Sequence, residues 1–367
     1  MSSVKIKDIT NYLEQWAPRL LQEDYDNAGL LVGLPQTTVT GVLVTLDCIE
    51  SVVEEAIQNN CNLIVAHHPI VFRGLKRLNG SNYIERTVIK AIKHDIAIYA
   101  IHTNLDNVHT GVNRMIGKKL GINEMRILQP KPGTLLKLVV FVPQENKETL
   151  LKGIYNAGAG QIGNYKNCSF QLTGEGTFTP NELANPHIGS ALTPETVKEV
   201  RVEVILAQHQ KAAVLKAMRD NHPYEEVAYY LSKLENENQE IGSGMIGKLD
   251  SPLSSTDFLK MVKANLQAPV IRHTASLSRP IQTVAWCGGS GSFLLSQAKA
   301  VGADAFVSAD FKYHEFFDAD GEILVADIGH FESEQFTKDL LIDVLKEKFT
   351  TFAIIFSKIV TNPISYL

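Results

Sequence analysis

The chain has 367 residues, of which 44% are hydrophobic and 20% are charged, and its net charge is -5 at pH 7. This composition excludes wholesale disorder, and the length predicts more than one folding unit. The net negative charge disfavours nucleic acid as a partner, because surfaces that bind nucleic acid are normally basic. A chain of this length can fold without a structural metal, so we expect any metal site to serve chemistry.

The cysteines and the amino-terminal segment indicate the compartment. The four cysteines are scattered and form no C-x-x-C pair, which is typical of a reducing compartment and excludes the usual cysteine zinc sites. The first residues lack the apolar stretch of a signal peptide, and no run of ~18 apolar residues occurs. We therefore expect a cytoplasmic protein that does not enter a membrane.

Two strand-like runs in the first third of the chain end at potential metal ligands. Residues 62–66 are apolar and stop at His67 and His68, and residues 96–101 stop at His102. The proline that follows His68 ends the strand, so both histidines can face one site. Taken alone, the pair is better explained by two hydrogen-bonded histidines at the end of a strand.

The middle of the chain has a different pattern. It begins near residues 129–133, which read Gln-Pro-Lys-Pro-Gly, and its expected elements follow the order strand, helix, strand, strand, helix. That order predicts a ferredoxin-like α+β domain inserted into a larger α/β domain. The predicted divisions are 1–128 for the first half of the metal-binding domain, 129–244 for the insert and 245–367 for the second half.

A third buried strand, at residues 323–327, is followed by two more potential ligands. His330 and Glu334 are four residues apart at the expected start of a helix, so they share one helical face. Asp106, which follows the strand at 96–101, adds a second carboxylate. Ligands in α/β sheets gather beyond the carboxyl ends of the strands. The candidate metal ligands are therefore His67, His68, Asp106, His330 and Glu334.

This set of three imidazoles and two carboxylates predicts the kind of metal site. Five ligands are too many for one open catalytic zinc ion but suit two divalent ions that share carboxylates, typically ~3.5–4 Å apart. Zinc, iron and manganese all accept such ligands. Glu334 taken alone would be explained as part of a solvated helix face.

Two further histidines are candidates for proton transfer. His102 lies four residues before Asp106 and is a candidate ligand, supporting group or general base; a hydrogen-bonded histidine at a strand end is the alternative. His314 and Asp310 follow the strand at 305–309, where a capping aspartate and a surface histidine are the alternative. The segment Gly288 to Ser292 joins a strand to a helix and is a weak candidate for anion binding.

The two flanking segments also resemble each other. A shift of 242 residues places Val42-Leu43-Val44 over Val284-Ala285-Trp286 and His68 over Asp310. A duplicated α/β unit explains this match, and so does the general similarity of strand–helix–strand units.

The motifs together resemble the Nif-three-like dinuclear metal family, also described as the GTP cyclohydrolase I type 2 homologues. The middle of the chain resembles the PII/CutA-like insert of the longer bacterial members. The matching stretches of the flanking segments are Asp26 to Gly33, Ala66 to Phe72, His102 to Asp106, Gly288 to Gly291, and Gly329-His330 with Glu334. One departure is Tyr25, where many members carry tryptophan.

The resemblance implies a dinuclear site at the same five residues and a toroidal homohexamer whose metal sites face an internal cavity. It also implies a metal-dependent hydrolase, GTP cyclohydrolase-like or phosphoesterase-like, that acts on a nucleotide or related small molecule. His102 or His314 would move protons. The alternative is a regulatory or metal-handling hexamer whose insert senses a small ligand and which turns nothing over.

Overall fold

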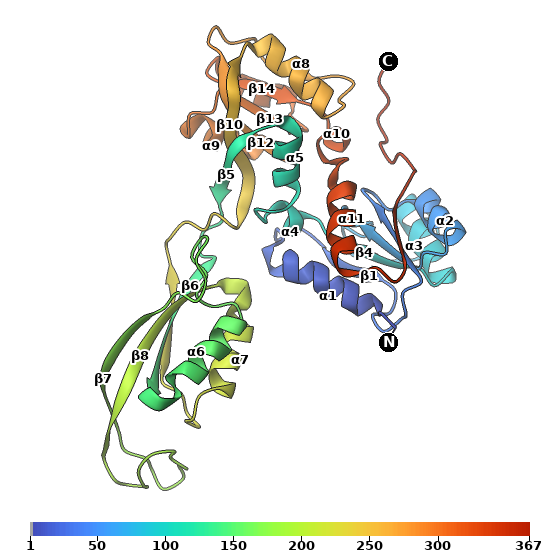
Figure 1. Cartoon of the computed structure of the whole chain (residues 1–367). Helices are drawn as coiled ribbons and strands as arrows, with labels where there is room; N and C mark the ends of the chain where they lie inside the picture. Colours follow the sequence, from blue (N-terminus) through green and yellow to red (C-terminus); the bar gives the residue numbers. More distant parts are fainter. Residues whose placement is uncertain (1–2) are drawn as a thin grey trace. The chain divides into compact units, whose positions relative to one another are not determined.

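The computed structural model describes residues 3–367, which form two compact units (Figure 1). The main domain comprises the chain up to Pro130 together with Gln239–Leu367, and the insert comprises Lys131–Asn238. The insert is shorter than the expected 129–244 because Pro130 pairs with Gly242 in a sheet of the main domain. None of the helices in residues 3–367 is long and apolar enough to cross a membrane.

The main domain contains a five-stranded sheet whose strands are buried apolar runs. Its order is β1-β4-β3-β2-β15, with β1 antiparallel and the other strands parallel. The strands are β1 (Gly29–Val32), β2 (Gly41–Thr45), β3 (Leu63–Ala66), β4 (Ala97–Ala100) and β15 (Ala353–Phe356). Side chains of α2 (Glu50–Gln58) and α3 (Tyr83–Lys93) pack against one face, and those of α1 (Ile6–Trp16) and α11 (Thr337–Lys348) pack against the other. Burial on both faces explains why these strands have no polar–apolar alternation.

The second sheet of the main domain has six strands in the order β11-β14-β13-β12-β10-β5. The strands are β5 (Asn123–Pro130), β10 (Gly242–Leu253), β11 (Arg272–His273), β12 (Ile281–Ser290), β13 (Ala305–Ala309) and β14 (Leu324–Asp327). The helices of this part are α5 (Val112–Leu120), α8 (Ser255–Asn265) and α9 (Leu295–Ala300). Phe258 of α8 and Trp286 of β12 are fully buried in the core that the two sheets share.

The two sheets repeat one arrangement. Strands β4-β3-β2 and β14-β13-β12 have the same order, are parallel, and are each flanked by an antiparallel strand, β1 or β11. Val42 pairs with Leu63, and Val284 pairs with Ala305, so the register is the same after the 242-residue shift. The predicted pair of similar α/β halves is therefore present.

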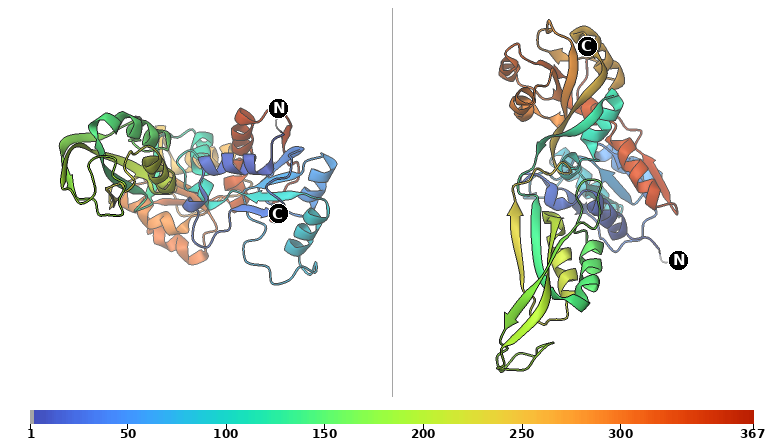
Figure 2. Two further views of the ribbon diagram at one scale, coloured as in Figure 1. Left: turned by 90° about the horizontal axis from the view of Figure 1, so that it is seen from below. Right: turned by 60° about the vertical axis from the view of Figure 1, so that its left-hand side comes forward.

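The insert has its own antiparallel sheet and its own core. Its elements are β6 (Leu135–Pro143), α6 (Lys147–Asn156), β7 (Phe170–Phe178), β8 (Glu195–Ala207), α7 (Lys211–Asp220) and β9 (Tyr229–Leu234). The sheet order is β7-β8-β6-β9. Both helices cover one face of the sheet (Figure 2), where Leu138, Val202, Ile154 and Met218 form a buried cluster. The chain order is βαββαβ: its first five elements follow the expected strand, helix, strand, strand, helix, and β9 is a further strand that the sequence did not predict.

Short helices complete the chain. They are η1 (Arg19–Leu21), α4 (Thr103–Asp106), η2 (Gln144–Asn146), η3 (Gln208–Gln210), η4 (Ser292–Leu294), η5 (Tyr313–Ala319) and α10 (His330–Glu334). Two of them, α4 and α10, begin just after β4 and β14 and carry candidate ligands.

Candidate metal centre

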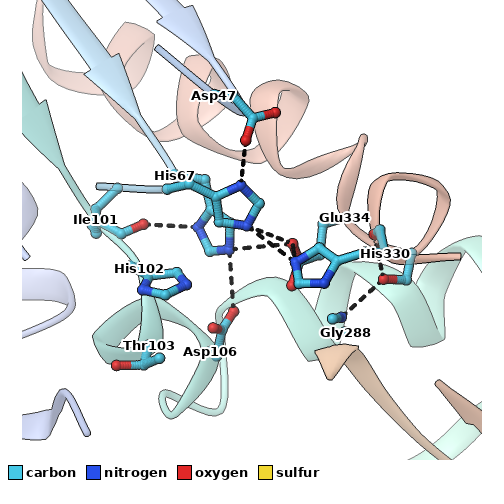
Figure 3. Close-up of polar contacts among 12 residues, drawn as sticks. Asp47, His67, Ile101, His102, Thr103, Asp106, Gly288, His330 and Glu334 are labelled. Carbon is cyan, nitrogen blue, oxygen red and sulfur yellow. Dashed lines mark hydrogen bonds and ion pairs between the residues drawn. The ribbon is translucent and has the colours of Figure 1, made fainter. Parts of the chain in front are cut away.

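The structure brings the five predicted ligands together between the two sheets of the main domain (Figure 3). His67 and His68 follow β3, Asp106 ends α4, and His330 and Glu334 lie one turn apart on α10. Two tight groups of potential ligand atoms include Glu334, which is 3% exposed, and a third consists of His67, His68 and His102. Each half of the main domain contributes to the site, so the centre requires both.

The Nε2 atoms of the three histidines converge on one carboxylate oxygen. Glu334 Oε2 lies 3.0 Å from His68 Nε2, 3.2 Å from His330 Nε2 and 3.8 Å from His67 Nε2. The Nε2 atoms of His68 and His330 are 3.3 Å apart. Because two imidazole nitrogens at this separation share at most one proton, a cation between them relieves the repulsion of their lone pairs.

Two buried atoms in the centre lack hydrogen-bond partners. His67 Nδ1 donates to the carbonyl oxygen of Ile101 at 2.8 Å, so Nε2 carries the lone pair. That Nε2 atom faces Asp106 Oδ1 at 3.6 Å, and neither atom has a hydrogen-bond partner. Burial lowers the pKa of His67, which favours the neutral, metal-binding form. Since unpartnered buried polar atoms are costly, this pair fits residues that hold a metal ion.

Each of the other two histidines is held by a carboxylate on its far side. His68 Nδ1 donates to Asp47 Oδ1 at 2.8 Å, and His330 Nδ1 donates to Asp310 Oδ2 at 2.7 Å. This carboxylate–histidine arrangement is typical of metal sites, because it fixes the ring and leaves Nε2 facing the metal. Asp310 is singled out beside His314 in the sequence, whereas Asp47 is not. Its position just beyond β2, as His68 lies just beyond β3, is the signal that points to it.

The carboxylates and imidazoles shift each other's proton affinities. Burial opposes the charge on His68, but the Asp47 and Glu334 carboxylates outweigh it and raise the pKa of His68 to about 9. Burial likewise opposes the charge on His330, yet Glu334 and Asp310 raise its pKa to about 11. For Asp106, burial and the Glu334 carboxylate both raise the pKa well above its usual value. The raised pKa values of the two histidines reflect the carboxylates gathered around them, and the same negative charge would favour a divalent cation in place of the protons on Nε2.

The glycine segment at the end of β12 serves packing rather than anion binding. A Cβ atom at Gly289 would lie 2.5 Å from Glu334 Oε1, and the φ of Gly289 is +61°. The N–H of Gly288 already donates to Asn113 Oδ1, and that of Gly289 donates to Ser333 Oγ. These two N–H groups are thus not available to an anion, and the glycines allow α10 to approach the strand.

Of the two predicted proton-transfer histidines, the structure places only His102 at the centre. Its ring centroid is 5.3 Å from those of His67 and His68. Its Nδ1 donates to Asp26 Oδ1 at 2.7 Å, so Asp26 orients the ring. His314 is exposed on η5, where it contacts the rings of Tyr313 and Phe317, and it does not line the metal cavity.

A cavity of about 530 Å³ opens above the metal centre. Tyr25, Phe72 and Phe293 line it with large exposed rings, while the ligands form its polar base. Residues 362–364 form another part of the wall. Flat apolar walls around a few convergent polar groups are typical of a small-molecule site.

The carboxy-terminal segment at 357–366 contacts Asp47, which holds His68, and Glu332, which lies between His330 and Glu334 on α10. Thr361 Oγ1 donates to Asp47 Oδ2 at 2.6 Å, and so braces the carboxylate that holds His68. Asn362 Nδ2 and the Tyr366 hydroxyl donate to Glu332 Oε1 at 3.0 and 3.1 Å. Glu332 is buried on α10 between the two ligands of that helix. No periodicity or motif in the sequence indicates these contacts.

Fold and centre together define an α/β protein with a candidate metal centre between two related sheets. The family described as Duf34/NIF3 (NGG1p interacting factor 3) matches residues 4–363, and the chain belongs to this family. The predicted resemblance to the Nif-three-like family is therefore confirmed.

Individual relatives match along nearly the whole chain. A protein of Halalkalibacterium halodurans named GTP cyclohydrolase 1 type 2 homolog is 39% identical over 365 residues, which are 98% of each chain. A Bacillus subtilis protein of the same name is 37% identical and covers 100% of this chain and 99% of its own. The crystal structure of a Bacillus cereus protein related to NIF3 is 35% identical, with a TM-score of 0.88 and full coverage of both chains.

Proposed function

We propose that the protein is a dinuclear metal-dependent hydrolase that acts on a nucleotide or a related small molecule. The observation that carries this proposal is the convergence of three imidazole Nε2 atoms on Glu334 beside the unpartnered pair His67 Nε2 and Asp106 Oδ1. His67, Asp106 and Glu334 would hold one ion, while His68, His330 and Glu334 would hold the other. Zinc, iron and manganese all suit these ligands.

Divalent ions held there supply Lewis acidity and lower the pKa of a water molecule to near neutrality. The chain's own residues supply the rest. Asp47 and Asp310 hold the Nδ1 protons of His68 and His330, so that Nε2 of each ring can bind a metal. Asp26 likewise holds Nδ1 of His102, which leaves Nε2 of that ring directed away from Asp26. We assign proton transfer to His102, because it reaches the cavity and His314 does not.

The aromatic wall of the cavity supports a substrate with a flat ring. Tyr25 and Phe72 lie with ring centroids 6.1 Å apart at its rim, and Phe293 is 63% exposed. The names of the relatives, which refer to GTP cyclohydrolase, make GTP the first substrate to test. A toroidal hexamer, which the resemblance to the family implies, is part of the same proposal and is checked by native mass spectrometry.

The test combines metal content with turnover in wild type and Glu334→Gln. We expect about two metal ions per wild-type chain and release of product from GTP or a simple phosphoester. The variant loses the carboxylate that all three histidines approach, so metal content and turnover should fall together while the circular dichroism spectrum is unchanged. Glu347→Gln, an exposed change on α11, is the matched control. Unchanged turnover in Glu334→Gln would refute the proposal, and full metal content without turnover on any substrate would favour a regulatory protein.

A further inference from the structure

The insert contains a second cavity, which plays no part in the function proposed above. Its volume is about 650 Å³, within the ~300–1,000 Å³ range of small-molecule sites. Every residue that lines it belongs to the insert, from the four strands and from the loops at 179–188 and 224–228. The cavity can therefore be considered within the insert alone.

Two glycines leave the floor of this cavity bare. Gly174 and Gly176 lie on one face of β7, and Gly174 pairs with Glu199 of β8, which places Glu199 on the same face. A Cβ atom at Gly174 would meet nothing within 4 Å, so packing inside the chain does not require a glycine there. Glycine weakens the interior of a strand and often marks a place where a ligand approaches the backbone.

The groups above this floor are a carboxylate and a neighbouring phenol hydroxyl. A Cβ atom at Gly176 would lie 2.1 Å from Glu199 Oε2, so the missing side chain allows the Glu199 carboxylate to lie against β7. Burial and the interaction with the Glu199 carboxylate raise the pKa of Tyr224, which keeps the hydroxyl neutral. The carboxylate and the hydroxyl oxygen are thus two adjacent acceptors that a ligand with several N–H donors can contact together.

The charged side chains around the cavity determine whether a positively or a negatively charged ligand can bind. Glu199, Glu225 and Glu226 line it with carboxylates, whereas Glu175 lies between Gly174 and Gly176 on β7 and directs its side chain to the opposite face of the sheet. Arg201 and His187 are the basic side chains that line it, and the Arg201 guanidinium already contacts Glu203 at 2.7 Å. No lysine lines the cavity. Phosphates and carboxylates would be repelled, whereas a cation would be attracted.

Aromatic side chains select the shape of the ligand. Tyr224 lies beside Phe178 with ring centroids 6.2 Å apart, and Phe141 meets Tyr230 edge-on at 5.8 Å. Aromatic faces bind organic cations through the ring quadrupole. A bare metal ion fits less well, because within residues 3–367 the His, Cys, Asp and Glu groups close enough to hold one all lie at the metal centre. The carboxylates of the insert suit a larger cation that spans several of them.

We propose that the cavity of the insert binds a small organic cation with a flat, delocalised charged group, such as an amidinium or a guanidinium. The Glu199 carboxylate receives the N–H donors of this group, and the rings of Phe178 and Tyr224 pack against its apolar part.

The test is titration calorimetry on the full, metal-loaded chain with benzamidine and with agmatine. Benzoate, which has nearly the shape of benzamidine but the opposite charge, is the control ligand. We expect the cations to bind and benzoate not to bind. Glu199→Gln should weaken binding by about tenfold or more, the usual effect of losing a charged hydrogen bond. Gly174→Val should fill the floor and abolish binding without unfolding the chain, because the added side chain enters open space.

Two controls separate this site from the metal centre. Glu182 is an exposed glutamate in the loop at 179–188, and it does not line the cavity. The Glu182→Gln variant should therefore bind both cations like wild type. Metal content and turnover should be the same in all three variants. The proposal is overturned if neither cation binds, if benzoate binds equally well, or if Gly174→Val leaves binding intact. A change of oligomeric mass in Gly174→Val would instead assign this face to contacts between copies.

Discussion

At the scale of single residues, the metal centre depends as much on the acceptors behind the histidines as on the ligands. His67 is held by a backbone carbonyl, whereas His68 and His330 are held by Asp47 and Asp310. A carbonyl keeps a fixed position in its strand, but each aspartate is a side chain whose loss frees the ring. The two carboxylates are therefore the positions at which the centre can be weakened without removing a ligand.

We predict that Asp47→Ala lowers metal affinity by about 10- to 100-fold, the usual effect of losing such a partner. The reason is that His68 loses the acceptor that fixes its tautomer and raises its basicity. Competition with a fluorescent zinc chelator measures the change, and Asp47→Asn, which keeps an acceptor oxygen, should recover part of the affinity. Asp318→Asn, an exposed change, is the control. Equal affinity in Asp47→Ala and wild type would show that the carboxylate has no role in metal binding.

The sequence predicted which candidate ligands the fold brings together, but not all of the residues that hold them in place. The strands that precede His67, His102 and His330 are contiguous apolar runs followed by polar residues, and such a pattern can be recognised in the sequence alone. Thr361 and Asp47 are 314 residues apart, and their contact depends on how β15 and β2 pair. Contacts of this kind follow from tertiary packing and have no local signal in the chain.

At the scale of secondary-structure elements, the carboxy-terminal segment is the connection that the sequence did not indicate. Strand β15 places it beside β2 in the first sheet, and Asn362 and Tyr366 then contact Glu332 on α10 of the second half. The segment thus links Asp47, behind one ligand, to the helix that carries two others. It also forms part of the cavity wall. A displacement of this segment would therefore change both the geometry of the candidate ligands and the access of small molecules to the cavity.

We predict that Thr361→Val weakens metal binding by roughly fivefold, because one hydrogen bond contributes about 1 kcal/mol. Valine has nearly the shape of threonine but cannot donate to Asp47. Thr361→Ser keeps the hydroxyl and should bind metal like wild type, which separates the hydrogen bond from packing. Chelator competition on the purified chains provides the measurement. If both variants lose affinity equally, packing rather than the hydrogen bond is responsible.

At the scale of the whole molecule, the chain combines a candidate metal centre in one unit with a carboxylate-lined cavity in the other, and each unit has its own core. The buried cluster of the insert contains residues of the insert alone, and the ligands of the metal centre belong to the main domain alone. Units with separate cores can unfold in separate steps. A ligand that binds one unit in its folded state stabilises that unit by mass action.

We therefore predict two transitions in calorimetric melting of the full chain, of which a chelator lowers only one. Leu341→Ala in the main domain and Leu138→Ala in the insert assign the transitions, since truncating a fully buried leucine costs about 2–5 kcal/mol in the unit that contains it. Chelation should lower the transition that Leu341→Ala lowers, because His67 and Asp106 then face each other without a cation. Benzamidine should raise the transition that Leu138→Ala lowers. A chelator that shifts both transitions equally would contradict the assignment of the metal to the main domain, because the insert contributes no ligand to the centre.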